Sequence, residues 1–158
     1  MAVSFNLNGR TVQETVPAQQ VLADFLIERG VAGVRVSCDQ GVCGACTALV
    51  DGCPIATCAA FVFQVDGCDV VTVEGLSDSD DLHPMQRSFV DRFAMQCGYC
   101  TPGMVLTAVA LLNRKPDPSP DDVRRWLAGN VCRCTGYASI VDAVLDAARR
   151  RHDLRERT

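Results

Sequence analysis

The sequence predicts an α+β fold in which a small β-grasp-like domain is followed by an all-α domain that resembles a four-helix bundle. Between residues 3 and 74, several strand patterns surround one helical pattern. A polar, acidic stretch follows at 77–82, and after it only helical patterns appear. We therefore expect four segments: an N-terminal domain at 1–76, a linker at 77–82, a helical domain at 83–150 and a charged tail at 151–158. The alternative is that 77–82 is a solvated surface loop within one domain.

The N-terminal domain is expected to begin with a β-hairpin over residues 3–16. Apolar and polar residues alternate over 3–7, and Asn8-Gly9 suits a two-residue type I′ turn. Hydrophobic residues then recur at helical spacing over 21–26, and Gly30 is a good C-terminal stop. The pattern predicts three further strands, at 47–50, 55–58 and 70–73.

Four helices are expected after the linker. Pro84 opens the first, in which Met85, Phe89 and Phe93 repeat every four residues and predict a buried stripe. Thr101-Pro102 has N-cap and N1 chemistry and opens a second, strongly apolar helix that runs through residue 112. The third helix begins after Ser119, and the fourth spans about 136–149, with a frayed charged tail from residue 149 onward.

A cysteine pattern in the N-terminal part points to a metal centre. It reads C-x4-C-x2-C with a fourth cysteine downstream, formed by Cys38, Cys43, Cys46 and Cys58. This is the plant-type ligand spacing of a [2Fe–2S] cluster. Gly41 and Gly44 lie within the loop, where positive φ angles let backbone N–H groups approach the sulfurs closely. We therefore expect these four thiolates to bind one cluster.

A second cysteine set lies in the helical part as C-x2-C and C-x-C, formed by Cys97, Cys100, Cys132 and Cys134. In an up-down bundle, the loop between the first two helices lies at the same pole as the loop between the last two. The helix order therefore predicts that the four sulfurs meet. The N-termini of two helices would add positive dipole ends there. This set alone could also bind zinc in a Cys₄ site, although the first set favours iron.

Composition narrows the functional classes further. The net charge of −4 argues against general nucleic-acid binding. Ten cysteines without a secretory leader indicate metal rather than disulfides, and thus a cytoplasmic setting. No apolar run is long enough for a membrane span.

Taken together, the motifs resemble those of the small iron–sulfur subunit of the molybdenum hydroxylases, the xanthine dehydrogenase, aldehyde oxidase and carbon monoxide dehydrogenase family. The matching segments follow the family's order: NLNG at 6–9, CDQGVCGACTALVDG at 38–52, QCGYCTPGM at 96–104 and LAGNVCRCTGY at 127–137. The resemblance covers nearly the whole chain apart from the charged tail.

The resemblance implies a ferredoxin-like domain and a helical domain with one [2Fe–2S] cluster each. It also implies a large molybdopterin-binding subunit and a medium FAD-binding subunit, assembled as a dimer of heterotrimers. Electrons would run from molybdenum through the helical-domain cluster and then the N-terminal cluster to FAD. Gln96 and Cys134 would lie beside the pterin, and the loop glycines Gly41, Gly44 and Gly98 would help to form the cofactor sites.

Some positions depart from the family pattern. Members often have Lys-x-Gly before the first ligand cysteine, whereas this chain has Arg35-Val36-Ser37, which could change the hydrogen bonds and the potential of the cluster. Cys53 and Cys68 fit neither cysteine set, and small, semi-buried hydrophobic roles suffice for both.

The sequence therefore predicts the electron-transfer subunit of a molybdenum-dependent oxidoreductase, with the substrate oxidised on a partner subunit. No residue is typical of a catalytic acid, base or nucleophile. The alternatives are a free-standing ferredoxin-type carrier, a zinc-binding interaction module and a redox sensor with an exposed, labile cluster. The substrate stays open among N-heterocycles, purines, aldehydes, carbon monoxide and aromatic thioesters, because its pocket would lie on another chain.

Overall fold

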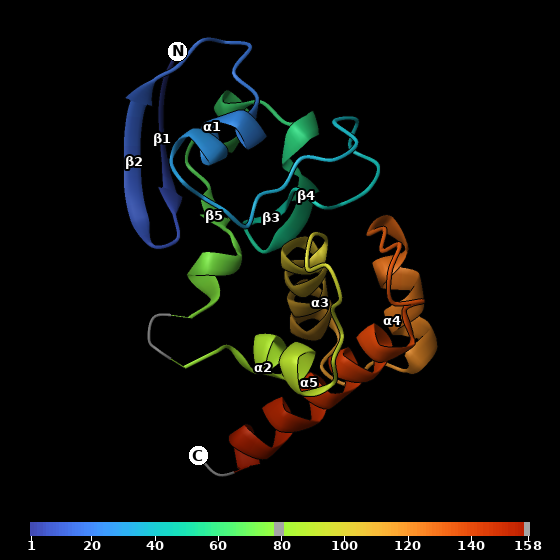
Figure 1. The fold of residues 1–158 in the computed structure, drawn as a ribbon. Helices are drawn as coiled ribbons and strands as arrows, with labels where there is room; N and C mark the ends of the chain where they lie inside the picture. The colour runs from blue at the N-terminus through green and yellow to red at the C-terminus, as the bar shows by residue number, and fades with distance from the viewer. Residues whose placement is uncertain (78–80, 157–158) are drawn as a thin grey trace.

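The computed structural model describes residues 1–77 and 81–156 of the chain. Part of the predicted linker, residues 78–80, therefore lies outside the described residues. Strands and one short helix occupy the first half, and four helices follow (Figure 1).

The predicted hairpin is present as β1 (Ala2–Leu7) and β2 (Arg10–Thr15). Asn8 and Gly9 have φ angles of 51° and 76°, as a type I′ turn requires. Val3 and Phe5 point into the core, while β2 is largely exposed at the edge of the sheet. The turn and the alternation therefore set the register that the sequence predicts.

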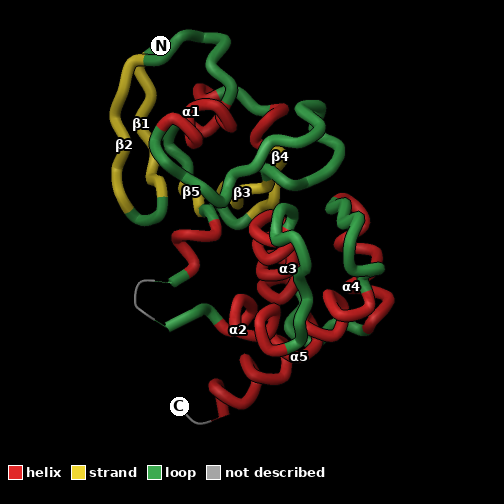
Figure 2. Tube along the Cα trace, viewed as in Figure 1, coloured by secondary structure: helices red, strands yellow, loops and turns green. Residues whose placement is uncertain are grey.

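Three further strands complete a five-stranded sheet in the order β2-β1-β5-β3-β4 (Figure 2). They are β3 (Thr47–Val50), β4 (Cys53–Ala56) and β5 (Asp69–Val71). β1 and β5 are parallel, and the other neighbours are antiparallel. The mixed sheet and the single helix over it confirm an α+β class for this part.

The expected strand at 55–58 was misplaced. Asp51 and Gly52 both have positive φ angles and turn the chain in two residues, so β4 begins at Cys53 and pairs with β3. β4 ends at Ala56, and Cys58 lies instead in a short 3₁₀ turn, Thr57–Ala59. β5 ends at Val71, two residues before the predicted end of the last strand.

One helix, α1 (Leu22–Glu28), packs against the sheet. Leu22, Phe25 and Leu26 are each at most 1% exposed, and the Phe25 ring lies 5.7 Å from the ring of Phe5. Gly30 follows the helix with a φ angle of 78°, which confirms it as the predicted stop.

The helical part contains the four expected helices, α2 (Pro84–Asp91), α3 (Thr101–Arg114), α4 (Pro120–Trp126) and α5 (Ala138–Glu156). α3 is buried along almost its whole length and lies at the centre, as its apolar composition predicts. Ser119 caps α4 through a hydrogen bond from the Asp122 N–H. In Figure 1, α5 runs diagonally below α3 and α4. A regular four-helix bundle is not confirmed.

Three helical expectations need correction. Phe93 does not continue the buried stripe of Met85 and Phe89, because α2 ends at Asp91 and the Phe93 side chain is 84% exposed. α3 begins at Thr101 with Cys100 as its N-cap, one residue earlier than the pattern suggests. α5 does not end near residue 149 but continues as a helix to Glu156.

The two halves share a packed boundary. Buried side chains form one cluster around α1 and the sheet and another around α3, yet Leu49 of β3 belongs to the helical cluster. The predicted domain limits stay a prediction. Among the described helices, none is long and apolar enough to cross a bilayer.

Candidate metal centres

The N-terminal cysteine loop aims backbone N–H groups at its sulfurs. Cys38 Sγ accepts the N–H groups of Gln40, Val42 and Cys43, each at 3.4 Å. The N–H of Gly41 donates to Cys58 Sγ at 3.2 Å, with Gly41 at a φ angle of 70°. A loop that directs several N–H groups at sulfur is suited to negatively charged, metal-bound thiolates.

Hydrogen bonds and burial shift the pKa values of two loop thiols in opposite directions. The N–H groups of Cys43, Gln40 and Val42 lower the pKa of Cys38 to about 6. Burial raises the pKa of Cys58 to about 11, against the hydrogen bond from Gly41. The loop therefore already stabilises one thiolate, which is the form that binds metal.

The helical cysteines also meet, as the topology argument predicts. Cys134 Sγ lies 3.6 Å from Cys97 Sγ, although thirty-six residues separate them in the chain. Burial raises the pKa of Cys100 to about 12, and its contact with Cys132 adds to this effect. Cys100 is also the N-cap of α3, so this helix begins directly at the cysteine cluster.

Within each set the thiols interact in pairs. Cys97 Sγ lies 3.6 Å from Cys134 Sγ, and hydrogen bonds with the thiols of Cys43, Cys46 and Cys132 contribute to the pKa shifts of Cys38, Cys58 and Cys100 respectively. Within the described part of the chain, no three His, Cys, Asp or Glu side chains converge as the ligands of a single metal ion would. Two pairs per set suit a binuclear cluster, in which each iron takes two cysteine ligands.

A direct contact joins the two cysteine loops. The N–H of Val131 donates to the carbonyl oxygen of Cys43 at 2.8 Å, and Asn130 Nδ2 donates to the carbonyl oxygen of Gly44 at 3.1 Å. A Cβ atom on Gly44 would lie 2.5 Å from Asn130 Nδ2, and its φ angle is 69°. Gly44 therefore serves the contact between the halves, in addition to the loop conformation predicted for it.

Tyr137 supports this contact from the helical side. Its hydroxyl accepts the N–H of Cys132 at 2.8 Å and donates to the carbonyl oxygen of Asn130 at 3.1 Å. The backbone of Tyr137 has a φ angle of 70°, which is uncommon for an aromatic residue. The surrounding contacts hold this conformation and fix the segment that carries Cys132.

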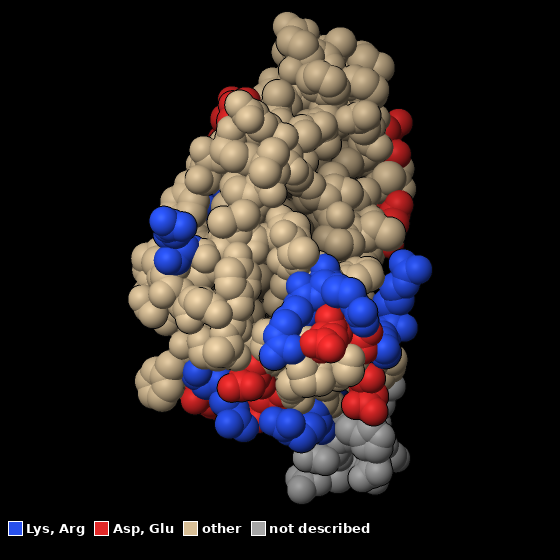
Figure 3. All heavy atoms as spheres, turned by 90° about the vertical axis from the view of Figure 1, so that its right-hand side faces the viewer, with Lys and Arg blue, Asp and Glu red and all other residues tan. Residues whose placement is uncertain are grey.

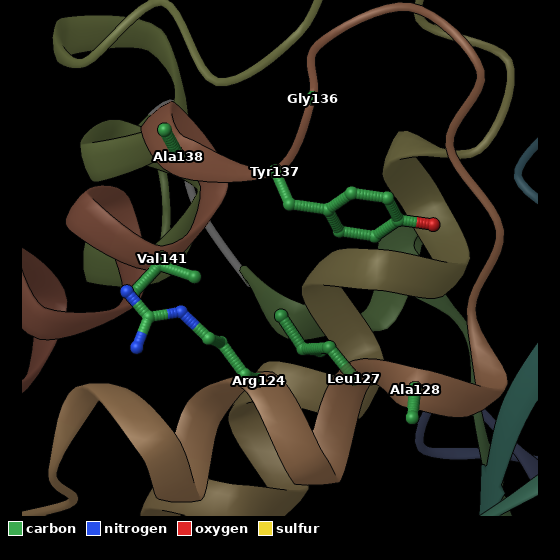
Figure 4. A pocket seen from close by; sticks show the side chains of 7 residues that line it. All are labelled: Arg124, Leu127, Ala128, Gly136, Tyr137, Ala138 and Val141. Carbon is green, nitrogen blue, oxygen red and sulfur yellow. The ribbon is translucent and has the colours of Figure 1, made fainter.

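A pocket of about 460 Å³ lies beside this segment, between α4 and the start of α5 (Figure 4). Leu127, Val141 and the Tyr137 ring contribute to its lining, and Arg124 stands at one side. The ring of Tyr137 extends away from α5, which places its hydroxyl against the cysteine loop. The pocket wall and the cysteine loop therefore depend on the same side chain.

The remaining predicted site residues lie at the surface of the helical cluster. Gln96, Cys97 and Cys134 are exposed, and Gly98 has a φ angle of 78°. Cys53 is exposed at the start of β4, so the semi-buried role expected for it is wrong, and it is not brought into either set. Cys68 is also outside both sets, with a hydrogen bond to the carbonyl oxygen of Asp66 at 3.8 Å.

Sequence reasoning missed several residues that shape the site. Asn130 and Tyr137 lie within a matched segment, but we did not assign their side chains any partner. Arg35 was noted only as a departure before Cys38, yet its guanidinium donates to the carbonyl oxygen of Gly98 in the other half. The spacing of an asparagine just before C-x-C is the signal that could have indicated the first of these contacts.

Charge is unevenly distributed on the face shown in Figure 3. Lys, Arg, Asp and Glu side chains gather on its lower part, whereas the upper part shows them only along its edges. Two ion pairs lie on α4, Arg124–Asp121 at 2.7 Å and Arg125–Asp122 at 3.1 Å. These exposed pairs contribute little to stability and chiefly keep this part hydrated.

Comparison with known families agrees with this geometry. Residues 5–62 match the model described as "2Fe-2S iron-sulfur cluster binding domain", and residues 72–145 match that described as "[2Fe-2S] binding domain". Fold and site together define an iron–sulfur protein with two [2Fe–2S]-binding domains. Each match contains one complete cysteine set.

Several relatives resemble the chain over nearly its whole length. The nicotine 6-hydroxylase small subunit of Paenarthrobacter nicotinovorans is 44% identical, covering 92% of this chain and 88% of the relative. The nicotinate dehydrogenase small FeS subunit of Eubacterium barkeri is 40% identical, covering 95% and 96%. This chain therefore belongs to the family of small iron–sulfur subunits of the molybdenum hydroxylases.

Solved structures show the same fold. Quinoline 2-oxidoreductase from Pseudomonas putida 86 matches with a TM-score of 0.88 and 46% identity, covering 95% of this chain and 96% of that chain. Aldehyde oxidoreductase from Desulfovibrio gigas matches with a TM-score of 0.93 and 39% identity over 98% of this chain, but over only 17% of that chain. In that protein, the matching region is one part of a much longer polypeptide.

Proposed function

We propose that this chain is the electron-transfer subunit of a molybdenum-containing hydroxylase or dehydrogenase, carrying electrons from a molybdopterin centre through two [2Fe–2S] clusters to FAD. The observation that carries the proposal is that two separate four-cysteine sets bring thiols together and that the loops of the two sets touch. Substrate would be oxidised on a large molybdopterin-binding subunit, and FAD would reside on a medium subunit. A cytoplasmic dimer of such heterotrimers completes the proposal.

The residues assigned to the two clusters follow from the two sets. Cys38, Cys43, Cys46 and Cys58 would hold the flavin-proximal cluster, and Cys97, Cys100, Cys132 and Cys134 the molybdenum-proximal one. Each cluster supplies a one-electron carrier when bound. The chain's own contribution is to orient the thiolates, to direct N–H groups at their sulfurs and to keep the two loops in contact.

The exposed residues near the helical cysteine set support the proposed order of the two clusters between molybdenum and FAD. Gln96 and Cys134 are both exposed there, so they are accessible to a pterin held by the large subunit. The N-terminal loop exposes a different stretch, in which Val42 is 65% exposed. Gly41 and Gly98 shape these two loops through their positive φ angles. The two clusters therefore have separate accessible sides, as a relay between two partners requires.

The backbone contact at Cys43 supports transfer between the clusters. The hydrogen bond from Val131 to the Cys43 carbonyl connects a proposed ligand of one cluster to the residue before Cys132, a proposed ligand of the other. The path from Cys43 to Cys132 is therefore covalent apart from this one hydrogen bond. A buried Asn130, 4% exposed, holds the same contact from its side chain.

For the substrate class we propose an N-heterocycle or an aldehyde. Relatives of this chain are named for nicotine, nicotinate and quinoline, all nitrogen heterocycles, and others are named for aldehydes. No residue of this chain is assigned to substrate, so the choice lies with the large subunit.

The proposal is tested on the complex purified with its native partners. Anaerobic addition of a substrate such as a hydroxylatable N-heterocycle should bleach the visible absorption of ferric iron–sulfur centres. Two electron paramagnetic resonance signals with different relaxation rates should then appear. A chain that purifies alone, without molybdopterin or FAD partners, would support the free ferredoxin-type carrier instead. A colourless chain that contains zinc would support the interaction module.

A further inference from the structure

A second contact between the halves involves residues that the proposed relay does not use. Arg35 Nη1 donates to the carbonyl oxygen of Gly98 at 2.7 Å, and Tyr99 donates its hydroxyl to the carbonyl oxygen of Val36 at 2.7 Å. The Arg35 guanidinium also lies over the Tyr99 ring, 5.6 Å from its centroid. The segment before Cys38 and the loop between Cys97 and Cys100 therefore hold each other by two reciprocal bonds.

The peptide unit that Arg35 contacts lies inside the helical ligand loop. The carbonyl of Gly98 and the N–H of Tyr99 belong to the same peptide, which stands between the proposed ligands Cys97 and Cys100. A charged donor on the carbonyl polarises the peptide and makes its N–H a stronger donor. The guanidinium therefore acts on the backbone of the loop that carries two of the proposed ligands.

This arrangement brings a positive charge to the helical-domain cluster without direct contact. Arg35 is half-buried, so solvent screens its charge less than it screens an exposed arginine. Reduction adds one negative charge to a cluster, and potentials of iron–sulfur clusters depend on nearby charge and on hydrogen bonds to sulfur. Both effects of Arg35 favour the reduced form.

We propose that Arg35 is a positioning residue that raises the reduction potential of the cluster held by Cys97, Cys100, Cys132 and Cys134, with Tyr99 holding its guanidinium in place. The inference rests on the proposed function, because it requires a [2Fe–2S] cluster at this set. It assigns a role to a side chain that belongs to the other half of the molecule. It also gives the two halves an electrostatic connection besides the contact at Cys43.

The test is a redox titration of the holo complex followed by electron paramagnetic resonance. Arg35→Gln removes the charge and retains an N–H donor, and Arg35→Lys retains the charge. Arg10→Gln makes the same change of net charge at an exposed position in the β1–β2 hairpin and serves as the control. The signal of the helical-domain cluster is identified by its persistence in Cys43→Ser.

We expect Arg35→Gln to lower the midpoint potential of the helical-domain cluster, with Arg35→Lys closer to the wild type and Arg10→Gln unchanged. Tyr99→Phe, which loses only the bond to Val36, should shift the potential in the same direction by less. An unchanged midpoint in Arg35→Gln, or an equal shift in Arg10→Gln, overturns the inference. If the wild type shows no second [2Fe–2S] signal, the proposed function itself fails.

Discussion

At the residue scale, backbone hydrogen bonds distinguish two of the proposed ligands, Cys38 and Cys58, from Cys53. Cys38 accepts three N–H groups and Cys58 accepts one, all from the same loop. Cys53 is exposed at the start of a strand that leads away from the loop. Among the described residues, none donates a hydrogen bond to the Cys53 sulfur that would stabilise a metal-bound thiolate.

Because Cys43 belongs to the N-terminal set and Cys53 belongs to neither set, we expect opposite results for their serine variants. Cys43→Ser should lose the N-terminal cluster, so the iron content should fall from about four to about two per chain. Cys53→Ser, the matched control, should retain the iron content of the wild type. Iron analysis of the purified complex measures both. Loss of iron in the Cys53 variant would show that the ligands are misassigned.

Asp146 is a buried carboxylate at the junction of α2 and α5. It is 5% exposed, accepts a hydrogen bond from Ser88 at 2.9 Å and pairs with Arg92 and with Arg150, the latter at 2.7 Å. Burial alone would raise the pKa of Asp146, but the bonds from Arg92 and Ser88 and the charge of Arg150 outweigh it and hold the pKa at about 2. The ionised carboxylate therefore stabilises the fold.

Asp146→Asn should lower the free energy of unfolding at pH 7 by about 2 kcal/mol. A depressed pKa contributes stability above the unfolded value, near 4, and this contribution is lost only as the pH falls toward 2. Thermal unfolding at pH 7 and pH 5 should therefore give the same difference between variant and wild type. A difference that already shrinks at pH 5 would contradict the depressed pKa. The exposed Asp142→Asn on the same helix is the control.

At the scale of elements, α1 and α2 end with the same backbone motif, but only the end of α1 could be predicted from the sequence. α1 ends with Gly30 N–H bonded to the Ile27 carbonyl and Val31 N–H bonded to the Leu26 carbonyl, a Schellman motif with glycine in the left-handed position. The glycine made this end predictable.

α2 ends with the same motif but without a glycine. Phe93 occupies the left-handed position with a φ angle of 51°, and Ala94 N–H bonds to the Phe89 carbonyl. Ala94 then turns inward and is 2% exposed, which leaves Phe93 outside. The repeat of apolar residues every four positions predicted a buried Phe93, because such a pattern assumes that the helix continues and gives no sign of a left-handed backbone at phenylalanine.

The close approach of α3 to the N-terminal loop gives a further prediction. Gly103 lies in the first turn of α3, and a Cβ atom there would meet the Gly44 carbonyl oxygen. Alanine favours a helix by up to about 1 kcal/mol over glycine. The collision with fixed backbone outweighs this gain, so Gly103→Ala should lower the free energy of unfolding by roughly 1–3 kcal/mol.

Denaturant unfolding of Gly103→Ala measures this effect. Gly129→Ala is the control, because a Cβ atom at that position meets no atom within 4 Å. The control should unfold like the wild type. If Gly103→Ala is as stable as the wild type or more stable, the contact between α3 and the Gly44 carbonyl is not as tight as the structure has it.

At the scale of the whole molecule, helix order alone predicted that the helical cysteines meet, and Cys97 and Cys134 do lie 3.6 Å apart. The contacts between the two cysteine loops could not be predicted in this way. They depend on single polar groups, such as Asn130 on Gly44 and Arg35 on Gly98, whose partners are distant in the chain. Local spacing determines each cysteine set, whereas tertiary packing determines how the sets face each other.

The central claim is that eight cysteines form two separate binuclear iron centres. Combined iron and zinc analysis of the fully loaded complex, with spin quantitation after reduction, tests it most directly. The account predicts about four irons per chain and two distinct paramagnetic centres of about one spin each. About two irons with a single centre, or zinc in place of iron, would contradict it.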